Sequence, residues 1–240
     1  MTKKIAAIVP AYNEEKAIIA VVNDICAVAK QNNLEIDVIV VNDFSSDSTA
    51  EIISELPCIA LHLPINLGIG GAVQTGFKYA FENNYEYALQ IDGDGQHPAN
   101  EIPKLIKKAL EDNADVVIGS RFIDKSGFQS SLLRRIGINY FKWLNYFLVG
   151  IKINDSTSGF RLINKKVMEN VCENYPDEYP EPETIVIYSL NNYKISEVSV
   201  TMKSRQGGIS SIGKFASVYY MLKVTLSSVC SFIRIKYQKK

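Results

Sequence analysis

The chain has 240 residues, of which 47% are hydrophobic and 22% are charged, so it can bury a full core and favours one large domain over two small ones. Basic and acidic residues balance at 26 each, but eight basic residues and no acid follow Glu197, and this acidic body with a basic tail argues against a general nucleic-acid-binding protein. The four cysteines lie far apart, without the paired spacing of zinc sites or disulfide frameworks, which favours a reducing cytoplasm.

Five short apolar runs are rich in β-forming residues and nearly continuous, which predicts strands buried on both faces. The runs are Ile5–Val9, Ile36–Val41, Cys58–Leu63, Tyr87–Ile91 and Val116–Ile118. Between them lie four stretches with helical spacing or capping residues, at Glu14–Lys30, Asp47–Leu56, Gly70–Asn83 and Asn100–Asn113. This alternation predicts an α/β fold with a doubly wound, mostly parallel sheet and helices on both faces.

The pattern changes in the second half of the chain. It predicts a helix at Leu132–Val149, a short strand at Gly159–Ile163, two more helical stretches, a strand at Lys194–Met202 and a terminal helix. No repeat, low-complexity segment or linker interrupts the chain.

Polar segments follow each of the first four predicted strands. They are Pro10–Glu15, Asn42–Asp47, Asn66–Gly71 and Asp92–His97. Because ligands bind beyond the carboxyl ends of the strands in such sheets, these segments predict a ligand site at one edge.

The fourth polar segment carries Asp92 and Asp94 with one glycine between them, directly after a buried strand. Carboxylate oxygens suit a hard cation, Mg²⁺ or Mn²⁺, bound jointly with substrate phosphates. An Asp-Gly-Asp-Gly run by itself is more often a turn, but its place after the fourth strand favours the metal site. His97 precedes a proline, and such a lone histidine is more often a loop residue than a metal ligand.

The glycine-rich loop at Asn66–Gly71 resembles a phosphate cradle. It lacks the Lys-Ser/Thr end of a P-loop, and it follows the wrong strand for a dinucleotide fingerprint. Nucleoside-triphosphate hydrolysis and hydride transfer are therefore rejected.

Five motifs, taken together and in order, resemble those of family 2 glycosyltransferases. They are Val9–Glu15, Val41–Thr49, Asp92–His97, Gly119–Phe122 and Thr157–Arg161. The nearest branch is the polyprenyl-phosphate glycosyltransferases, and the likeness covers roughly residues 4–212. Five ordered motifs are far more specific than any one of them alone.

The resemblance implies a GT-A fold over residues 1–211, a nucleotide-diphosphate sugar donor, a divalent metal and inversion at the anomeric carbon. Carried over by position, the residues that bind the donor nucleotide are Pro10, Tyr12, Glu14, Asp43, Asp92 and Arg205. Those that surround the metal and the diphosphate are Asp92, Asp94 and Gln96. Asn42 departs from a frequent Asp-Asp pair and Phe44 replaces a usual glycine, so a UDP-sugar is only weakly favoured over other donors.

Two kinds of acceptor stay open. A phosphate monoester is largely ionised near neutrality, its second pKa being about 6, and needs positive guides. The resemblance assigns that role to Arg121 and Arg135, whose guanidinium groups suit phosphate oxygens. A hydroxyl of a lipid-linked or cell-envelope glycan needs a carboxylate base, for which Asp155 and Glu183 are the candidates. For all four side chains the alternative is a structural ion pair.

The terminal segment Phe215–Ile233 is apolar and flanked by basic residues, and Lys223 interrupts it. It approaches the ~20 residues that span a bilayer, but its lysine and serines disfavour burial in lipid. We therefore expect residues 212–240 to form a basic amphipathic helix on an anionic membrane, peripherally attached to the cytoplasmic face of the plasma membrane. The alternative is a last helix packed on the core.

These observations predict a metal-dependent, inverting enzyme that moves a sugar to a polyprenyl phosphate. A rival of another class is a non-catalytic, sugar-nucleotide-binding partner of a glycosyltransferase complex, but the intact Asp92 and Asp94 argue against it. A nucleotidylyltransferase would need a glycine- and arginine-rich loop after the first strand, where this chain has Ala11–Glu14.

Overall fold

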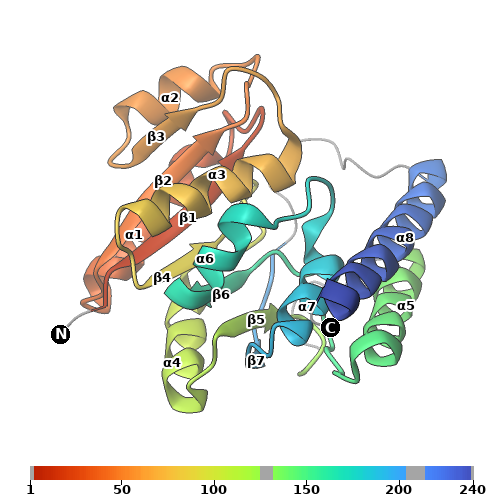
Figure 1. Cartoon of the computed structure of the whole chain (residues 1–240). Helices are drawn as coiled ribbons and strands as arrows, with labels where there is room; N and C mark the ends of the chain where they lie inside the picture. The colour runs from red at the N-terminus through yellow and green to blue at the C-terminus, as the bar shows by residue number, and fades with distance from the viewer. Residues whose placement is uncertain (1–2, 125–131, 204–213, 239–240) are drawn as a thin grey trace.

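The computed structural model describes residues 3–124, 132–203 and 214–238. In this part of the chain one sheet has the strand order β3-β2-β1-β4-β6-β5-β7 (Figure 1). Its strands are β1 (Ile5–Ala11), β2 (Ile36–Asn42), β3 (Ile59–His62), β4 (Tyr87–Gln90), β5 (Val116–Ser120), β6 (Arg161–Asn164) and β7 (Ile195–Ser199). β6 runs antiparallel to its neighbours β4 and β5, and the other pairs are parallel. The predicted mostly parallel sheet is confirmed.

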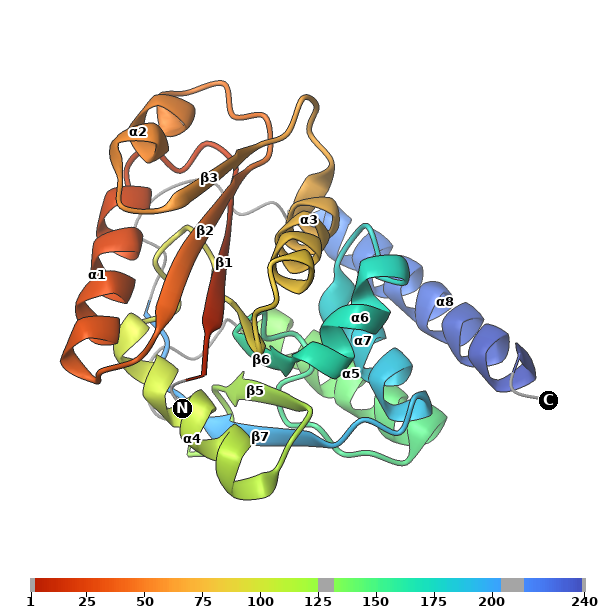
Figure 2. The ribbon, with the colours of Figure 1, turned by 60° about the vertical axis from the view of Figure 1, so that its left-hand side comes forward.

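Helices cover both faces of this sheet, as the alternating pattern predicts. They are α1 (Ile18–Gln31), α2 (Thr49–Glu55), α3 (Gly68–Glu82), α4 (Ile102–Asp112), α5 (Leu132–Val149), α6 (Lys165–Glu173), α7 (Pro180–Leu190) and α8 (Lys214–Gln238). A short 3₁₀ helix, η1 (Ala99–Glu101), precedes α4. Helices α1, α2 and α4 pack on one face, and α3, α6 and α7 pack on the other (Figure 2). All of β1 is buried between these layers.

The first helix begins later than predicted, at Ile18 instead of Glu14. Ahead of it, the Glu14 N–H donates to Thr49 Oγ1 over 2.9 Å, and the Glu15 N–H donates to Asp47 Oδ2 over 3.3 Å. A turn in which the Glu14 carbonyl accepts the N–H groups of Ala17 and Ile18, both over 3.0 Å, precedes α1.

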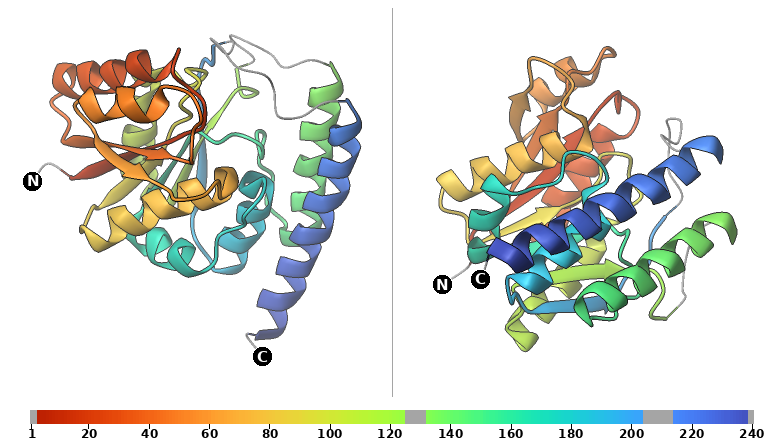
Figure 3. Two further views of the ribbon diagram at one scale, coloured as in Figure 1. Left: turned by 90° about the horizontal axis from the view of Figure 1, so that it is seen from above. Right: turned by 45° about the vertical axis from the view of Figure 1, so that its right-hand side comes forward.

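Helices α5 and α8 lie side by side, outside the layer that α7 belongs to (Figure 3). Glu183 of α7 accepts hydrogen bonds from Ser227 and Ser231 of α8, the second over 2.6 Å. Lys223 of α8 pairs with Glu178, before α7, over 2.6 Å. One face of the terminal helix is thus fastened to the body of the protein.

Candidate active site

The ends of β1, β2 and β4 bring three of the polar segments together at one edge of the sheet. In the strand register Ala11 lies opposite Asn42, and Ile8 lies opposite Gln90. The Asp43 N–H donates to the Ala11 carbonyl over 2.9 Å, which continues the pairing past the end of β2. The three loops therefore start side by side, as the sheet topology requires.

Hydrogen bonds connect the loop after β1 to the loop after β2. The Asn13 N–H donates to Ser45 Oγ over 3.0 Å, and the Ser46 N–H donates to Asn13 Oδ1 over 2.8 Å. The Ser48 N–H donates to Glu15 Oε2 over 3.2 Å. The two loops form one surface that carries most of the predicted donor-binding residues.

The predicted donor-binding residues of these loops differ in exposure. Pro10 is buried, Glu14 is half-buried and Tyr12 is 52% exposed. Phe44 is 57% exposed and has a φ of 60°, in the left-handed region that costs a side chain about 1–2 kcal/mol. That backbone conformation explains why glycine is usual at this position, and Phe44 retains it while presenting an exposed ring.

Asp43 is buried and ties the loop after β2 to the glycine-rich loop. Its Oδ1 accepts the Leu67 N–H over 2.7 Å, and Asn66 Nδ2 donates to the Asp43 carbonyl over 3.1 Å. Burial raises the pKa of the Asp43 carboxyl, and the N–H groups of Leu67 and Gly68 offset part of that rise. Asp43 is therefore held in one position at the edge where the resemblance places the nucleotide.

The loop after β4 is fixed by its own side chains. Asp94 is buried; its Oδ1 accepts the Gln96 N–H over 2.9 Å, and its Oδ2 accepts from Gln96 Nε2 over 2.6 Å. His97 Nδ1 accepts the Asp92 N–H over 3.0 Å, while Nε2 lies 3.7 Å from Asp92 Oδ2. The His97 ring stacks on Phe160 with centroids 5.0 Å apart. His97 thus stabilises the loop, which agrees with the interpretation of its sequence as a loop residue.

Asp92 and Asp94 stay the predicted ligands of a metal ion that is shared with a diphosphate. In the described residues, no group of three or more His, Cys, Asp or Glu side chains is arranged to hold a metal ion. Mg²⁺ is usually bound through one or two carboxylates together with substrate phosphates, so a complete protein cage is not needed. The two carboxylates of this loop supply that number.

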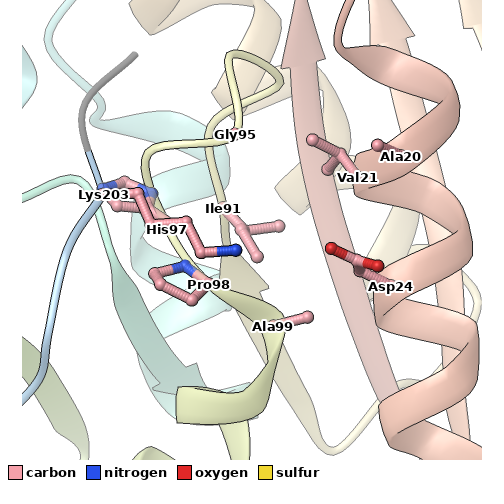
Figure 4. A pocket seen from close by; sticks show the side chains of 9 residues that line it. All are labelled: Ala20, Val21, Asp24, Ile91, Gly95, His97, Pro98, Ala99 and Lys203. Carbon is pink, nitrogen blue, oxygen red and sulfur yellow. The ribbon is translucent and has the colours of Figure 1, made fainter. Parts of the chain in front are cut away.

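A small cavity of about 20 Å³ lies behind the same loop, against α1 (Figure 4). Ile91 and His97 line one side, and Val21 and Asp24 of α1 line the other. The Lys203 ammonium points across it toward Asp24 (Figure 4). A cavity of this size has room for about one water molecule. This cavity is therefore too small for a nucleotide.

At the end of β5, Arg121 forms a buried ion pair with Asp155. Arg121 Nε donates to Asp155 Oδ2 and Nη2 donates to Oδ1, both over 2.7 Å, and the Arg121 N–H adds a bond to Oδ2 over 3.1 Å. Arg121 Nη2 also donates to Thr157 Oγ1 over 3.1 Å. Burial alone would lower the pKa of Arg121, but the Asp155 carboxylate raises it above its ordinary value. Arg121 therefore stays charged.

Comparison with known proteins identifies this arrangement. The sequence pattern of glycosyl transferase family 2 matches residues 6–172. The chain belongs to this family. The UDP-N-acetylglucosamine--dolichyl-phosphate N-acetylglucosaminyltransferase of Methanococcus voltae is 31% identical over 95% of this chain and 98% of its own length. The polyprenol monophosphomannose synthase of Mycolicibacterium smegmatis is 27% identical over 87% of this chain and 81% of its own length.

Solved structures agree on the fold of this glycosyltransferase. The glucosyl-3-phosphoglycerate synthase of Mycobacterium tuberculosis, crystallised with Mn²⁺, uridine diphosphate and glucosyl-3-phosphoglycerate, superimposes with a TM-score of 0.71. Its sequence is only 15% identical, over 96% of this chain and 80% of that one, so the likeness concerns the fold alone. The predicted GT-A fold and family membership are confirmed.

The structure brings two of the predicted acceptor residues together and does not bring the other two to them. Arg121 and Asp155 bind each other, Arg135 is exposed on α5, and Glu183 binds α8. Arg205 lies outside the described residues. The roles assigned to these residues in the reaction stay predictions.

Sequence reasoning missed two carboxylates. Glu197 of β7 accepts the N–H groups of Asn154 and Asp155 over 2.8–3.0 Å and so holds the turn that presents the Asp155 side chain. Glu181 lies beside Asp92; burial raises its pKa, Asp92 adds to that rise, and Arg161 opposes it. The pattern Pro-Glu-Pro-Glu, which forms the first turn of α7, pointed to this acidic segment, but it did not reveal which glutamate faces the sheet edge.

The contribution of the buried ion pair to stability can be tested. Asp155→Asn would leave Arg121 buried without its counter-charge, so we expect the free energy of unfolding to fall by about 3–5 kcal/mol in chemical denaturation. Lys107→Met, which removes a surface pair with Glu111, is the matched control and should cost less than about 1 kcal/mol. Equal effects of the two variants would contradict a tightly held pair.

Proposed function

We propose that this glycosyltransferase moves a sugar from a UDP-sugar to a polyprenyl phosphate at a membrane surface, with inversion at the anomeric carbon. The name of the Methanococcus voltae relative specifies both UDP-N-acetylglucosamine and dolichyl phosphate. The name of the mycobacterial relative specifies a polyprenol product. These relatives support the donor and the acceptor class, and the side chains at the site support the acceptor independently.

The observation that carries the acceptor assignment is that both predicted bases are occupied. Asp155 binds Arg121 with both carboxylate oxygens, and Glu183 binds two serines of α8. A hydroxyl acceptor needs a base within hydrogen-bond reach, whereas a phosphate monoester, with a second pKa of about 6, is already ionised. Side chains engaged in this way favour an acceptor that brings its own charge.

The residues of the site divide the work of the proposed transfer. Asp43, Tyr12 and the loops around them would position the nucleotide. Asp92 and Asp94 would hold Mg²⁺ or Mn²⁺, which neutralises the charge that gathers on the departing UDP. Arg135, exposed near the start of α5, would guide the acceptor phosphate, whose oxygen attacks the anomeric carbon from the side opposite to the leaving group.

Metal dependence is tested at Asp94. Asp94→Asn keeps the volume of the side chain and loses its charge, so we expect transfer to fall by more than about 100-fold, since even partners of metal ligands cost about 10- to 100-fold. Glu111→Gln, at an exposed acid of α4, is the control and should retain activity. Calorimetry should show that the variant loses Mn²⁺-dependent UDP binding. Unchanged binding and turnover would remove the metal from the mechanism.

The acceptor is tested by supplying polyprenyl phosphate and a lipid-linked glycan in parallel. We expect transfer to the phosphate, and Arg135→Ala should raise its KM about 10-fold or more, because a charged hydrogen bond contributes about 1.5–3 kcal/mol. The KM for the donor should change less than about twofold, and Lys107→Ala on α4 should change neither value. Activity confined to the glycan, and lost in Asp155→Asn or Glu183→Gln, would establish the hydroxyl acceptor instead.

A two-helix surface supports attachment to a membrane. Large apolar side chains are exposed along α5 and α8, which lie side by side (Figure 3). They are Ile136, Tyr140, Trp143, Tyr146 and Phe147 on α5, and Tyr219, Leu222, Leu226, Ile233 and Tyr237 on α8. None of the helices in the described residues is both long and apolar enough to cross a membrane. Aromatic rings with basic neighbours such as Arg234 and Lys236 suit an anionic lipid interface.

Attachment through this surface can be tested without removing α8, which is fastened to α7. Trp143→Ala and Phe147→Ala should each weaken binding to anionic vesicles about 10-fold, because a buried aromatic side chain contributes roughly 1.5–3 kcal/mol. Leu110→Ala, at an exposed apolar residue of α4, is the matched control and should have no effect. Raising the salt concentration should weaken binding further. Vesicle binding that is equal in all three variants would rule out this surface.

A further inference from the structure

Three polar side chains converge on Gly159, in the loop before β6. A Cβ placed on Gly159 would lie 3.0 Å from Gln90 Nε2, 3.3 Å from Asp92 Oδ1 and 3.6 Å from Glu181 Oε1. Any larger residue at position 159 would fill the space that these groups share. Glycine therefore keeps open a small polar recess beside the proposed metal ligand Asp92.

Glu181 is held firmly at this recess. Its carbonyl accepts hydrogen bonds from Arg161 Nη2 over 2.8 Å and from Thr184 Oγ1 over 3.0 Å. Pro180 and Pro182 flank it and restrict the backbone of the first turn of α7. The position of Glu181 is thus set before any ligand binds.

The recess also holds a hydrogen-bond donor with unused capacity. In the described residues Gln90 Nε2 is buried and completes no hydrogen bond, although it lies near enough to Glu181 to favour the charged form of that carboxyl and lower its pKa slightly. Tyr175 donates to Gln90 Oε1 over 3.5 Å, which sets the orientation of the amide. A buried donor without a partner costs free energy, and a ligand acceptor would relieve that cost.

The charges around the recess restrict its ligand. Asp92 and Glu181 both border it, so a phosphate group that is not bound to the proposed metal ion would be repelled. A neutral hydroxyl suits both sides, because its O–H can donate to a carboxylate while its oxygen accepts from an amide. Such hydroxyls belong to the sugar that the proposed function places next to Asp92.

We propose that Glu181 and Gln90 bind hydroxyl groups of the transferred sugar and so select which UDP-sugar is used. This inference rests on the proposed function and adds the residues that recognise the sugar. A site built to bond a hydroxyl discriminates strongly against sugars that lack it or present it in another direction, because its buried polar groups are then left without partners.

The test compares the affinities of UDP and of a panel of UDP-sugars by calorimetry, without acceptor. Wild-type protein should prefer one UDP-sugar. Glu181→Gln should weaken the binding of that UDP-sugar about 10- to 100-fold, which is the range for a hydrogen bond to a charged group. The affinity for UDP should change less than about twofold. Gly159→Ala should act in the same way by filling the recess. Glu173→Gln, at an exposed acid of α6, is the control and should change neither affinity.

Two outcomes would overturn the inference while leaving the proposed function intact. One is an unchanged sugar preference, or an equal loss for UDP and UDP-sugar, in Glu181→Gln. The other is normal binding of every donor with turnover abolished, which would make Glu181 a base in the reaction. Wild-type protein that binds no nucleotide sugar would overturn the proposed function together with the inference, and this shows before any variant is made.

Discussion

The buried ion pair between Arg121 and Asp155 organises the side of the site where we propose that the acceptor binds. It joins the end of β5 to the loop before β6, and Glu197 of β7 holds the same loop through the Asp155 N–H. Removing two charges from water is costly, and the cost is offset only because Asp155 receives three bonds from Arg121. Because both side chains of the pair are held in place, we expect the pair to shape the site and not to react.

Helix α7 links that site to the proposed membrane surface. Successive helical residues are rotated by about 100°, so Glu181 and Glu183 point in nearly opposite directions. Glu181 faces the recess beside Asp92, and Glu183 accepts the hydroxyls of Ser227 and Ser231 on α8. Helix α8, which carries exposed apolar side chains, is therefore bonded to the same turn of α7 that carries Glu181.

The parts of this protein that sequence predicts are those controlled by local patterns. Runs such as Ile5–Val9 predict buried strands, and the motifs after them predict the loops of Asp43 and Asp92. The bond between Arg121 and Asp155 spans 34 positions, and the antiparallel insertion of β6 between β4 and β5 is a long-range pairing. Neither of these contacts produces a periodic pattern in the sequence. Which of the two glutamates, Glu181 or Glu183, faces Asp92 likewise depends on the direction in which α7 packs. The spacing of the two residues does not determine that direction.

The distribution of charge explains why donor and acceptor would meet in one orientation. Acidic groups surround the proposed sugar and metal positions, at Asp92, Asp94 and Glu181, whereas Arg135 lies on α5, next to the exposed apolar residues. An anionic lipid head group would be repelled by the acidic recess and attracted toward the basic, apolar side. Its chain would then lie along α5 and α8 while its phosphate approaches the anomeric carbon. Electrostatics would thus place the two substrates on opposite sides of the reacting bond, which is the arrangement that inversion requires.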